Sequence, residues 1–470
     1  MQTLLIKDLR LLLSDFKFQI FFVLLIVLFI LAAISGSVTY HAYSKEYQAS
    51  LNEHIKNTND ESSYSLRSII SGQYKISVID VPSPALLFNN YEYYHNKLTN
   101  LSMIYRPTFG RYGAVGSEVF QLDWNFILGI LTGFIMLIMS FEAVSNEKRA
   151  GTLRLLSING YKRQTVLWCK YLSYLILYLI IIIPPALISM ILFFAFTGTW
   201  EISYMLKFLV IIVLSIPFAS FFILLGIFIS MAKNYRSSIV LIISIWLLFV
   251  IIIPQSANIF GKQLSPIKTI TEYSQGINKA WMTEYDYQNK MADEAIDRGE
   301  ETEPANRMAT IINSADEKRN VLELQRLEDN KKQLRTVENI TSISPFTQYE
   351  KISEIVFDKG FYLQGFQQET MKNTITQIKN LIIEQDSRDD KSLHAFYSQA
   401  GGVNYYREDQ KISFSEQKFD HPNLLFVTNI PTDDTLGKIM KITKWLIPIL
   451  TLNLLLIISS VIKLEKLDIR

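Results

Sequence analysis

Six long stretches with no charged residue near their centres interrupt this chain, and they limit what it can fold into more than any other feature. The hydrocarbon core of a bilayer is about 30 Å thick, so a helix that rises about 1.5 Å per residue needs about 20 apolar residues to cross it. Stretches of this length are typical of membrane spans. The predicted spans are residues 18–40, 123–142, 167–196, 206–232, 237–258 and 442–463.

Composition agrees with a membrane protein and excludes one class of partner. Charged residues make up 19% of the chain, which is below the value of about 25% that is usual for soluble domains. These charges gather between the predicted spans. The formal net charge of +2 provides no extended basic surface, so nucleic-acid binding is not expected.

Two polar blocks, residues 41–122 and 259–441, separate the spans and are predicted to fold outside the membrane. Helices are expected from Thr271 to Arg298 and from Asn306 to Glu338, and a strand is possible from Ile76 to Val81. We therefore expect an all-α polytopic membrane protein with six transmembrane helices. Its extracytoplasmic domain is expected to be mainly helical and to be built from these two insertions.

Residues 1–17 are predicted to form a helix that lies in the cytoplasmic interface of the membrane. Leu5, Leu9, Leu12 and Phe16 fall at helical spacing on one face, with charged residues between them. The alternative is that this segment extends the first span.

Charge places both termini on the cytoplasmic side. Lys and Arg are enriched in residues 1–17, in the short turn 143–166 and in the tail 464–470, whereas the short turn after the third span carries none. Short loops rich in Lys and Arg stay in the cytoplasm. The two long blocks then face outward.

Several residues in or beside the spans have expected roles. Pro184, Pro185 and Pro217 are predicted to kink their helices, since proline removes a backbone donor. Pro254 is expected to mark the outer end of the fifth span. Trp124 is placed as an interfacial anchor.

The turn 143–166 is too short to be a domain and too patterned to be a linker. Basic side chains alone could be simple cytoplasmic anchors, but Glu147 and Gly151-Thr152-Leu153 are not explained in that way. Gly151 allows a sharp change of direction, the leucines and Ile158 offer an apolar contact, and the charges can set the register of a partner. The candidate contact residues are Glu147, Lys148, Arg149, Gly151, Thr152, Leu153, Arg154, Leu156, Ile158 and Arg163.

This pattern resembles a known family. An acidic residue at the end of a span, then E-[KR]-x-x-G-T-L, a basic pair and a lysine entering the next span are similar to type-2 ABC exporter permeases, in particular bacterial ones with two enlarged periplasmic insertions. Here Glu142 ends the span, Glu147 opens the motif and Lys170 enters the next helix. Glu142 is expected to cap its helix or to pair with Lys170.

The resemblance implies a coupling helix at Glu147–Arg163 that docks on a separate cytoplasmic ABC ATPase, which would bind ATP and Mg. It also implies a second permease subunit, homo- or heteromeric, in the bacterial inner membrane, with membrane lipid around it. A periplasmic protein is a further partner to consider.

Enzymatic motifs are absent from the sequence. It contains no G-x-x-x-x-G-K-[ST], HExxH, paired CxxC or G-x-S-x-G pattern. The five histidines are scattered through the polar blocks and are expected to be surface residues rather than metal ligands. We therefore expect no enzyme activity and no cofactor in this chain.

Two functions of different classes remain. The first is a permease that couples the ATPase to export of a lipid, peptide or hydrophobic compound, because the spans lack the central ionisable group that ion-coupled transporters use. The alternative is a mechanotransmitter, in which the ATPase moves the outer domains to act on a periplasmic partner without moving cargo. A receptor or scaffold without an ATPase would leave the central turn unexplained.

Overall fold

The structure is a computed structural model of the full chain. It describes residues 2–59, 76–78, 81–88, 96–98, 122–231, 235–298, 304–389, 417–427 and 432–466. Most of the first insertion, parts of the second, the turn around Lys233 and the end of the C-terminal tail lie outside the described residues, so the predictions made for them stay predictions.

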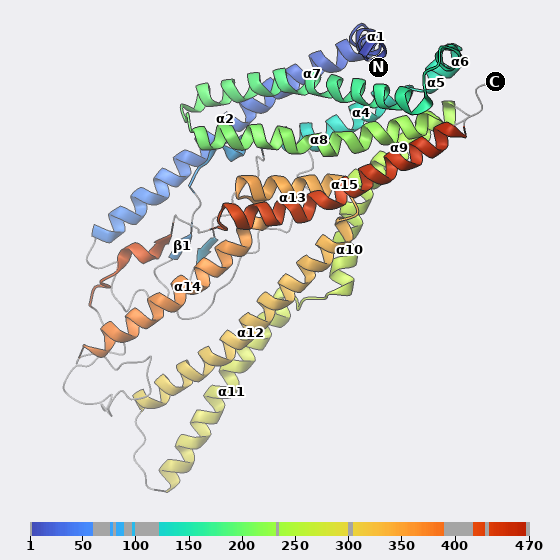
Figure 1. The fold of residues 1–470 in the computed structure, drawn as a ribbon. Coiled ribbons are helices and arrows are strands. Elements are labelled where there is room, and N and C mark those ends of the chain that lie inside the picture. Colours follow the sequence, from blue (N-terminus) through green and yellow to red (C-terminus); the bar gives the residue numbers. More distant parts are fainter. Residues whose placement is uncertain are drawn as a thin grey trace.

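Within the part of the chain that the structure describes, six helical stretches are long and apolar enough to cross a membrane, as the sequence predicted. They lie roughly parallel, and the two chain ends are found at the same end of the bundle (Figure 1). We call this the termini end and the opposite one the distal end. The six stretches are Phe16–Lys56, Phe126–Arg149, Arg163–Thr197, Ile202–Ser230, Ser238–Leu264 and Thr435–Glu465.

The N-terminal segment is a helix separate from the first span, and its place in the cytoplasmic interface stays a prediction. α1 (Gln2–Leu13) ends before Ser14, and α2 (Phe16–Asn59) begins two residues later. The Asp15 carboxylate accepts a hydrogen bond from the backbone N–H of Lys17 at 3.0 Å, which caps the new helix. Phe16 was assigned to the apolar face of the first helix, and this was wrong because it lies in α2.

α2 is much longer than the predicted first span. It has 44 residues, which corresponds to about 66 Å at about 1.5 Å per residue. The helix continues past residue 40, where the first insertion was expected to begin, and its second half extends beyond the bundle toward the distal end (Figure 1). The start of that insertion is thus a continuation of the span.

The second span is the central one. It consists of a π-helical turn, η2 (Phe126–Leu131), followed by α4 (Thr132–Ser140). Trp124, at its beginning, is fully buried and donates a hydrogen bond from Nε1 to Ser189 Oγ at 2.9 Å. Its assignment as an interfacial anchor was therefore wrong.

The third and fourth spans continue through their prolines. α7 (Arg163–Thr197) contains Pro184 and Pro185, and α8 (Ile202–Ser230) contains Pro217, without a break in either helix. Asn453, in α15 (Thr435–Glu465), donates a hydrogen bond to the carbonyl of Pro217 at 2.8 Å. The predicted kinks stay predictions.

The fifth span also extends further than predicted. α9 (Tyr235–Leu247), the π-helical turn η3 (Leu248–Ile252) and α10 (Ile253–Leu264) follow one another without interruption. Pro254 lies directly after the π-helical turn, and the helix continues through it without a break. The prediction that Pro254 ends the span was wrong.

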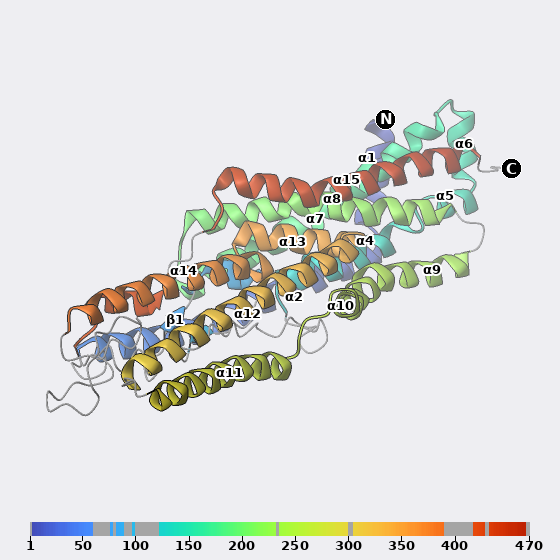
Figure 2. The same cartoon turned by 90° about the horizontal axis from the view of Figure 1, so that it is seen from below.

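The second insertion contains the two long helices that the sequence predicted. α11 (Ile270–Asp297) and α12 (Pro304–Thr341) form an antiparallel hairpin that projects past the distal end (Figures 1 and 2). Lys318 and Glu284 join the two helices by an ion pair of 2.7 Å.

The next helix returns into the bundle, which the sequence did not indicate. α13 (Pro345–Phe357) packs on α8 and α15 and contacts both π-helical turns. Ser344, the N-cap of α13, donates a hydrogen bond to the carbonyl of Phe249, near the middle of the fifth span. Tyr349 stacks on Phe218 of α8, with ring centroids 5.2 Å apart. This part of the insertion therefore belongs to the bundle rather than to an outer domain.

The depth of α13 follows from its two ends. Asp358, just after the helix, forms ion pairs with Lys207 at 3.1 Å and Lys438 at 2.6 Å, near the distal ends of α8 and α15. Ser344 lies 14 positions earlier, which is about 21 Å along a helix axis. α13 thus reaches deep among the spans. It places Lys351 and Glu354 between them, where these two side chains form an ion pair of 3.0 Å.

The remaining elements lie at the distal side. α14 (Gly360–Ser387) follows α13 and leads outward. A small sheet has the order β2-β1-β3, with β1 (Ile76–Val78) paired antiparallel to β2 (Asn96–Leu98) and parallel to β3 (Phe426–Val427). Short 3-10 turns, η1 (Pro84–Leu87) and η4 (Pro422–Leu425), flank them. The other elements among the described residues are helical, in agreement with the predicted all-α fold, and β1 lies where a strand was considered possible.

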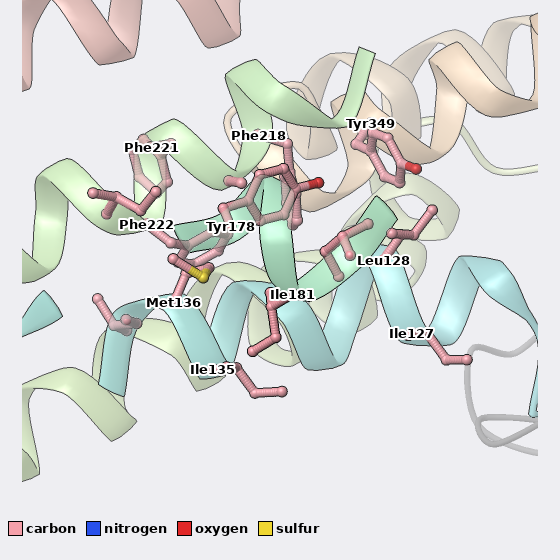
Figure 3. Packing of buried hydrophobic residues seen from close by; sticks show 14 of the residues in the cluster. Ile127, Leu128, Ile135, Met136, Tyr178, Ile181, Phe218, Phe221, Phe222 and Tyr349 are labelled. Atoms are coloured by element: carbon pink, nitrogen blue, oxygen red, sulfur yellow. The ribbon is translucent and has the colours of Figure 1, made fainter. Parts of the chain in front are cut away.

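The core is rich in aromatic side chains from the spans and α13. Figure 3 shows Tyr178, Phe218, Phe222 and Tyr349 meeting between the helices, and all four are fully buried. The Tyr178 hydroxyl is hydrogen-bonded to Ser215 Oγ, so the polar end of this ring is satisfied. Close packing of this kind leaves little room for added volume.

The contact between α4 and α8 gives a testable expectation. A Cβ at Gly226 would lie 1.9 Å from Ser140 Oγ. Overpacking costs about 1–3 kcal/mol, so Gly226→Ala should lower the thermal unfolding temperature of the purified protein. Gly365→Ala is the control, because its Cβ would meet nothing within 4 Å and alanine favours a helix by about 0.5–1 kcal/mol. Equal unfolding temperatures for the two variants would contradict the α4–α8 packing.

Candidate functional site

The segment between the second and third spans forms two short helices at the termini end. α5 (Ser145–Arg149) and α6 (Thr152–Ile158) are joined at Gly151, which has φ = 72°. A second turn at Gly160, with φ = 77°, directs the chain back to α7. Positive φ is readily adopted by glycine, so both changes of direction follow from the local sequence.

A buried lysine fixes this segment to the bundle. Lys170 Nζ, on α7, lies 2.6 Å from Glu147 Oε1 and 3.0 Å from Asp8 Oδ1. The exposed fractions of the three side chains are 11%, 11% and 7%. Thr152 Oγ1 donates to the other oxygen of Glu147 at 3.1 Å. One cation therefore joins α1, α5 and α7, and Thr152 carries the connection into α6.

Two members of the predicted contact set are consequently internal. Glu147 was expected to pair with charges on a partner, but its carboxylate is occupied by Lys170 and Thr152. Leu153 was expected to offer an apolar contact, but it is buried among Val144, Val166 and Leu464. Leu156 is half-buried against the same core. A direct contact of Glu147 and Leu153 with a partner was therefore wrong, because this face of α6 covers the ends of α7 and α15. The assignment of the half-buried Leu156 stays a prediction.

Arg163 has a structural role as well. Its guanidinium donates to the backbone carbonyls of Leu464 at 3.0 Å and Glu465 at 2.7 Å. These carbonyls belong to the last turn of α15, where backbone acceptors have no helical partner and the helix dipole favours a positive charge. Arg163 therefore caps the last span, and its contact with a partner stays a prediction.

The acidic residue at the end of the second span has a different partner from those expected. Glu142 Oε2 lies 3.0 Å from Lys17 Nζ, at the start of α2. Pairing with Lys170 was wrong, because Asp8 and Glu147 occupy that lysine. Glu142 ties α2 to the second span.

The outward face of α5 and α6 is apolar with a basic border. Leu155 is 58% exposed and Ile158 is 71% exposed, and they are three positions apart, so they share one side of α6. Lys148 and Arg149 on α5 and Arg154 on α6 are exposed as well. We call these five residues the coupling face.

Leu155 was missed by the sequence analysis. Leu153 and Leu156 are three positions apart, and so are Leu155 and Ile158, so helical spacing alone does not say which pair faces the bundle. The anchor at Glu147 decides this, since it orients the start of α6. The sequence did indicate a second apolar face on α6, because four of its seven residues are apolar, which is more than one buried face needs.

No metal centre accompanies the coupling face. In the ranges that the structure describes, no group of three or more His, Cys, Asp or Glu side chains is arranged to hold a metal ion. The site presents two exposed apolar side chains and three exposed cations, and its inner side is held by the lysine anchor.

Comparison with known proteins identifies one family. The profile described as ABC-2 family transporter protein matches residues 2–377, which is most of the chain. No curated protein and no solved structure matches it.

The lysine anchor can be tested by removing its charge. Lys170→Met would leave the buried carboxylates of Asp8 and Glu147 without a cation. Breaking a buried pair in this way costs about 3–5 kcal/mol, so the unfolding temperature should fall and α1 should become more accessible to protease. Lys17→Met is the matched control, since its side chain is 42% exposed and such pairs contribute about 0–1 kcal/mol. A Lys170 variant as stable as this control would contradict the anchor.

Proposed function

The chain belongs to the ABC-2 family of transporter proteins, and on this premise we propose that it is the permease subunit of an ATP-driven exporter. ATP hydrolysis takes place on a separate ABC ATPase, which binds ATP and Mg, and this chain contributes no catalytic residue. The cargo is a lipid, a peptide or another hydrophobic compound.

The coupling face is the observation that carries this proposal. Leu155 and Ile158 stand exposed at the termini end, where the described part of the chain does not cover them. Exposed apolar side chains bordered by charge are typical of a docking site. Lys148, Arg149 and Arg154 favour an ATPase surface that combines an apolar groove with acidic residues, because complementary charge sets the register of docking.

Movement of the docked ATPase would reach the spans through the lysine anchor. A force on α6 acts on Thr152 and Glu147, and from there on Lys170, near the start of α7. Arg163 transmits the same displacement to the end of α15. The buried contacts therefore support rigid-body coupling rather than bending of a loose loop.

The termini end is assigned to the cytoplasm of a bacterial inner membrane. The basic residues of α1, α5 and α6 lie there together, in agreement with the preference of short basic segments for the cytoplasmic side. A second permease is expected to pack against the spans. The fifth and sixth spans bury the smallest shares of their apolar stretches, so their outer faces are left for that subunit or for lipid.

The mechanotransmitter alternative is favoured by one observation. α12 has 38 residues, or about 57 Å, and its inner end continues through three residues into α13 inside the bundle. A Cβ at Gly261 of α10 would lie 2.3 Å from Val337 of α12, so this helix is also closely packed on the fifth span. Displacement of the spans would thus move the whole α11–α12 hairpin.

Docking can be tested with two charge substitutions on the coupling face. Leu155→Asp with Ile158→Asp should reduce co-purification of the neighbouring ATPase at least tenfold, since a tenfold loss requires about 1.4 kcal/mol. Both side chains are exposed, so the unfolding temperature should not change.

The matched control places the same substitutions on exposed apolar residues of the hairpin. Met282 is 59% exposed and Val321 is 54% exposed. Met282→Asp with Val321→Asp should leave ATPase recovery unchanged. Full recovery of the ATPase with the coupling-face variant would eliminate this face as the docking site.

Transport and mechanotransmission are separated by shortening the hairpin. The Glu284–Lys318 ion pair sets the register of α11 and α12, so residues 281–319 can be replaced by a Gly-Ser turn while α13 stays intact. A permease should keep its cargo-stimulated ATPase activity in lipid. A mechanotransmitter should show no stimulation by cargo, and the shortened hairpin should abolish the response of its ATPase activity to a periplasmic extract.

A further inference from the structure

A cavity of about 670 Å³ lies between α12, α13, α14 and α15, on the distal side of the bundle. On each of the four helices the lining residues recur every three or four positions, so each helix turns one continuous face toward the cavity. Lys331, Leu334 and Arg335 on α12 illustrate the pattern, and Lys441, Lys444 and Trp445 repeat it on α15. The coupling face is at the other end of the bundle, so this cavity is a separate site.

One part of the cavity wall is apolar and aromatic. It includes both aliphatic and ring side chains, some of which are half-buried and one of which, Trp445, is 9% exposed. Trp445 begins the apolar part of the sixth span, so this wall continues in the direction of the membrane. The apolar lining residues are Leu334, Ile355, Tyr362, Phe366 and Trp445.

The acidic groups of the cavity are largely neutralised within it. Lys351 Nζ lies 3.0 Å from Glu354 and 3.8 Å from Glu338. Lys441 Nζ lies 2.5 Å from Asp433 Oδ2, and Tyr362 donates to the same carboxylate at 2.9 Å. Burial alone would raise the pKa of Asp433, but these two hydrogen bonds outweigh it and lower the pKa below its usual value. Asp433 is therefore ionised and already paired.

Three cations lining the cavity remain without an acidic partner. Within the described ranges no ion pair is formed by three of the lining cations, Arg335, Lys372 and Lys444. Among the described carboxylates that line the cavity, Glu369 alone also forms no ion pair. The cavity thus has a positive excess beside an apolar wall. Unpaired cations beside an apolar surface match a ligand with an anionic head and an apolar chain.

The position of the cavity along the spans fits such a ligand. Asp358, which pairs with Lys438 at the distal end of α15, lies one turn from Glu354 in the cavity wall. Lys441 and Lys444 follow on the next turns of α15, directly before the apolar stretch. Cationic side chains at the end of a span lie at the level of lipid headgroups.

We propose that this cavity binds an anionic amphiphile from the bilayer, with its phosphate or carboxylate headgroup held by Arg335 and Lys444. Its apolar chain lies along Leu334, Phe366 and Trp445. Binding requires neither the ATPase nor export, so the site does not depend on the function proposed above.

The test is native mass spectrometry of the purified chain, without an ATPase, at increasing concentrations of phosphatidylglycerol, phosphatidylcholine or inorganic phosphate. The wild type should retain one phosphatidylglycerol with at least tenfold higher affinity than phosphatidylcholine, and phosphate alone should not compete. Arg335→Gln with Lys444→Gln should lower phosphatidylglycerol affinity at least tenfold. Bound lipid should also raise the unfolding temperature of the wild type, since a ligand of the folded state stabilises it.

The matched control removes the same charge outside the cavity. Lys262→Gln with Lys332→Gln alters two exposed lysines that do not line it and should bind like the wild type. Phe366→Asn should weaken phosphatidylglycerol binding by removing the apolar wall. Equal loss in the control, equal binding of phosphatidylcholine, or full competition by phosphate would each overturn the proposal, the last by showing a simple anion site.

Discussion

The position of the coupling face depends on one buried cation. Lys170 neutralises two carboxylates, Asp8 and Glu147, that are distant in sequence and belong to different helices. In a poorly solvated environment each of these charges is costly unless it is paired, so the three side chains hold α1, α5 and α7 in one arrangement. The inner face of α6 follows from this arrangement, and its outer face is what remains for a partner.

Charges buried toward the distal end of the molecule are also paired, but by other helices. α13 carries Lys351 and Glu354 into the bundle, where they pair with each other and with Glu338 of α12. Asp358 closes the distal end by joining Lys207 and Lys438. The second insertion is therefore packed with the spans, and α12 is connected without a flexible linker to a helix among them. This continuity is what makes both export and mechanotransmission physically reasonable for one fold.

Sequence reasoning succeeded where a local pattern has one solution. Charge-free stretches of sufficient length predicted all six candidate spans, and helical spacing located α11 and α12 closely. It failed at α13, because a helix of 13 residues with two glutamates and a lysine looks like ordinary surface sequence. The prediction that Trp124 is an interfacial anchor failed for a related reason. A tryptophan at the edge of a span is equally compatible with the lipid interface and with the interior of a bundle.

The sequence by itself determined that the chain is a six-span membrane protein with a patterned turn between the second and third spans, because backbone in lipid must form long apolar helices. Only the tertiary structure decided which side of that turn is exposed. Leu153 and Leu156 have the same spacing as Leu155 and Ile158, and the choice between the pairs depends on Lys170 reaching carboxylates from two other helices. Likewise, the cavity between α12 and α15 exists because α13 folds back among the spans, and no local pattern records a contact between residues so far apart.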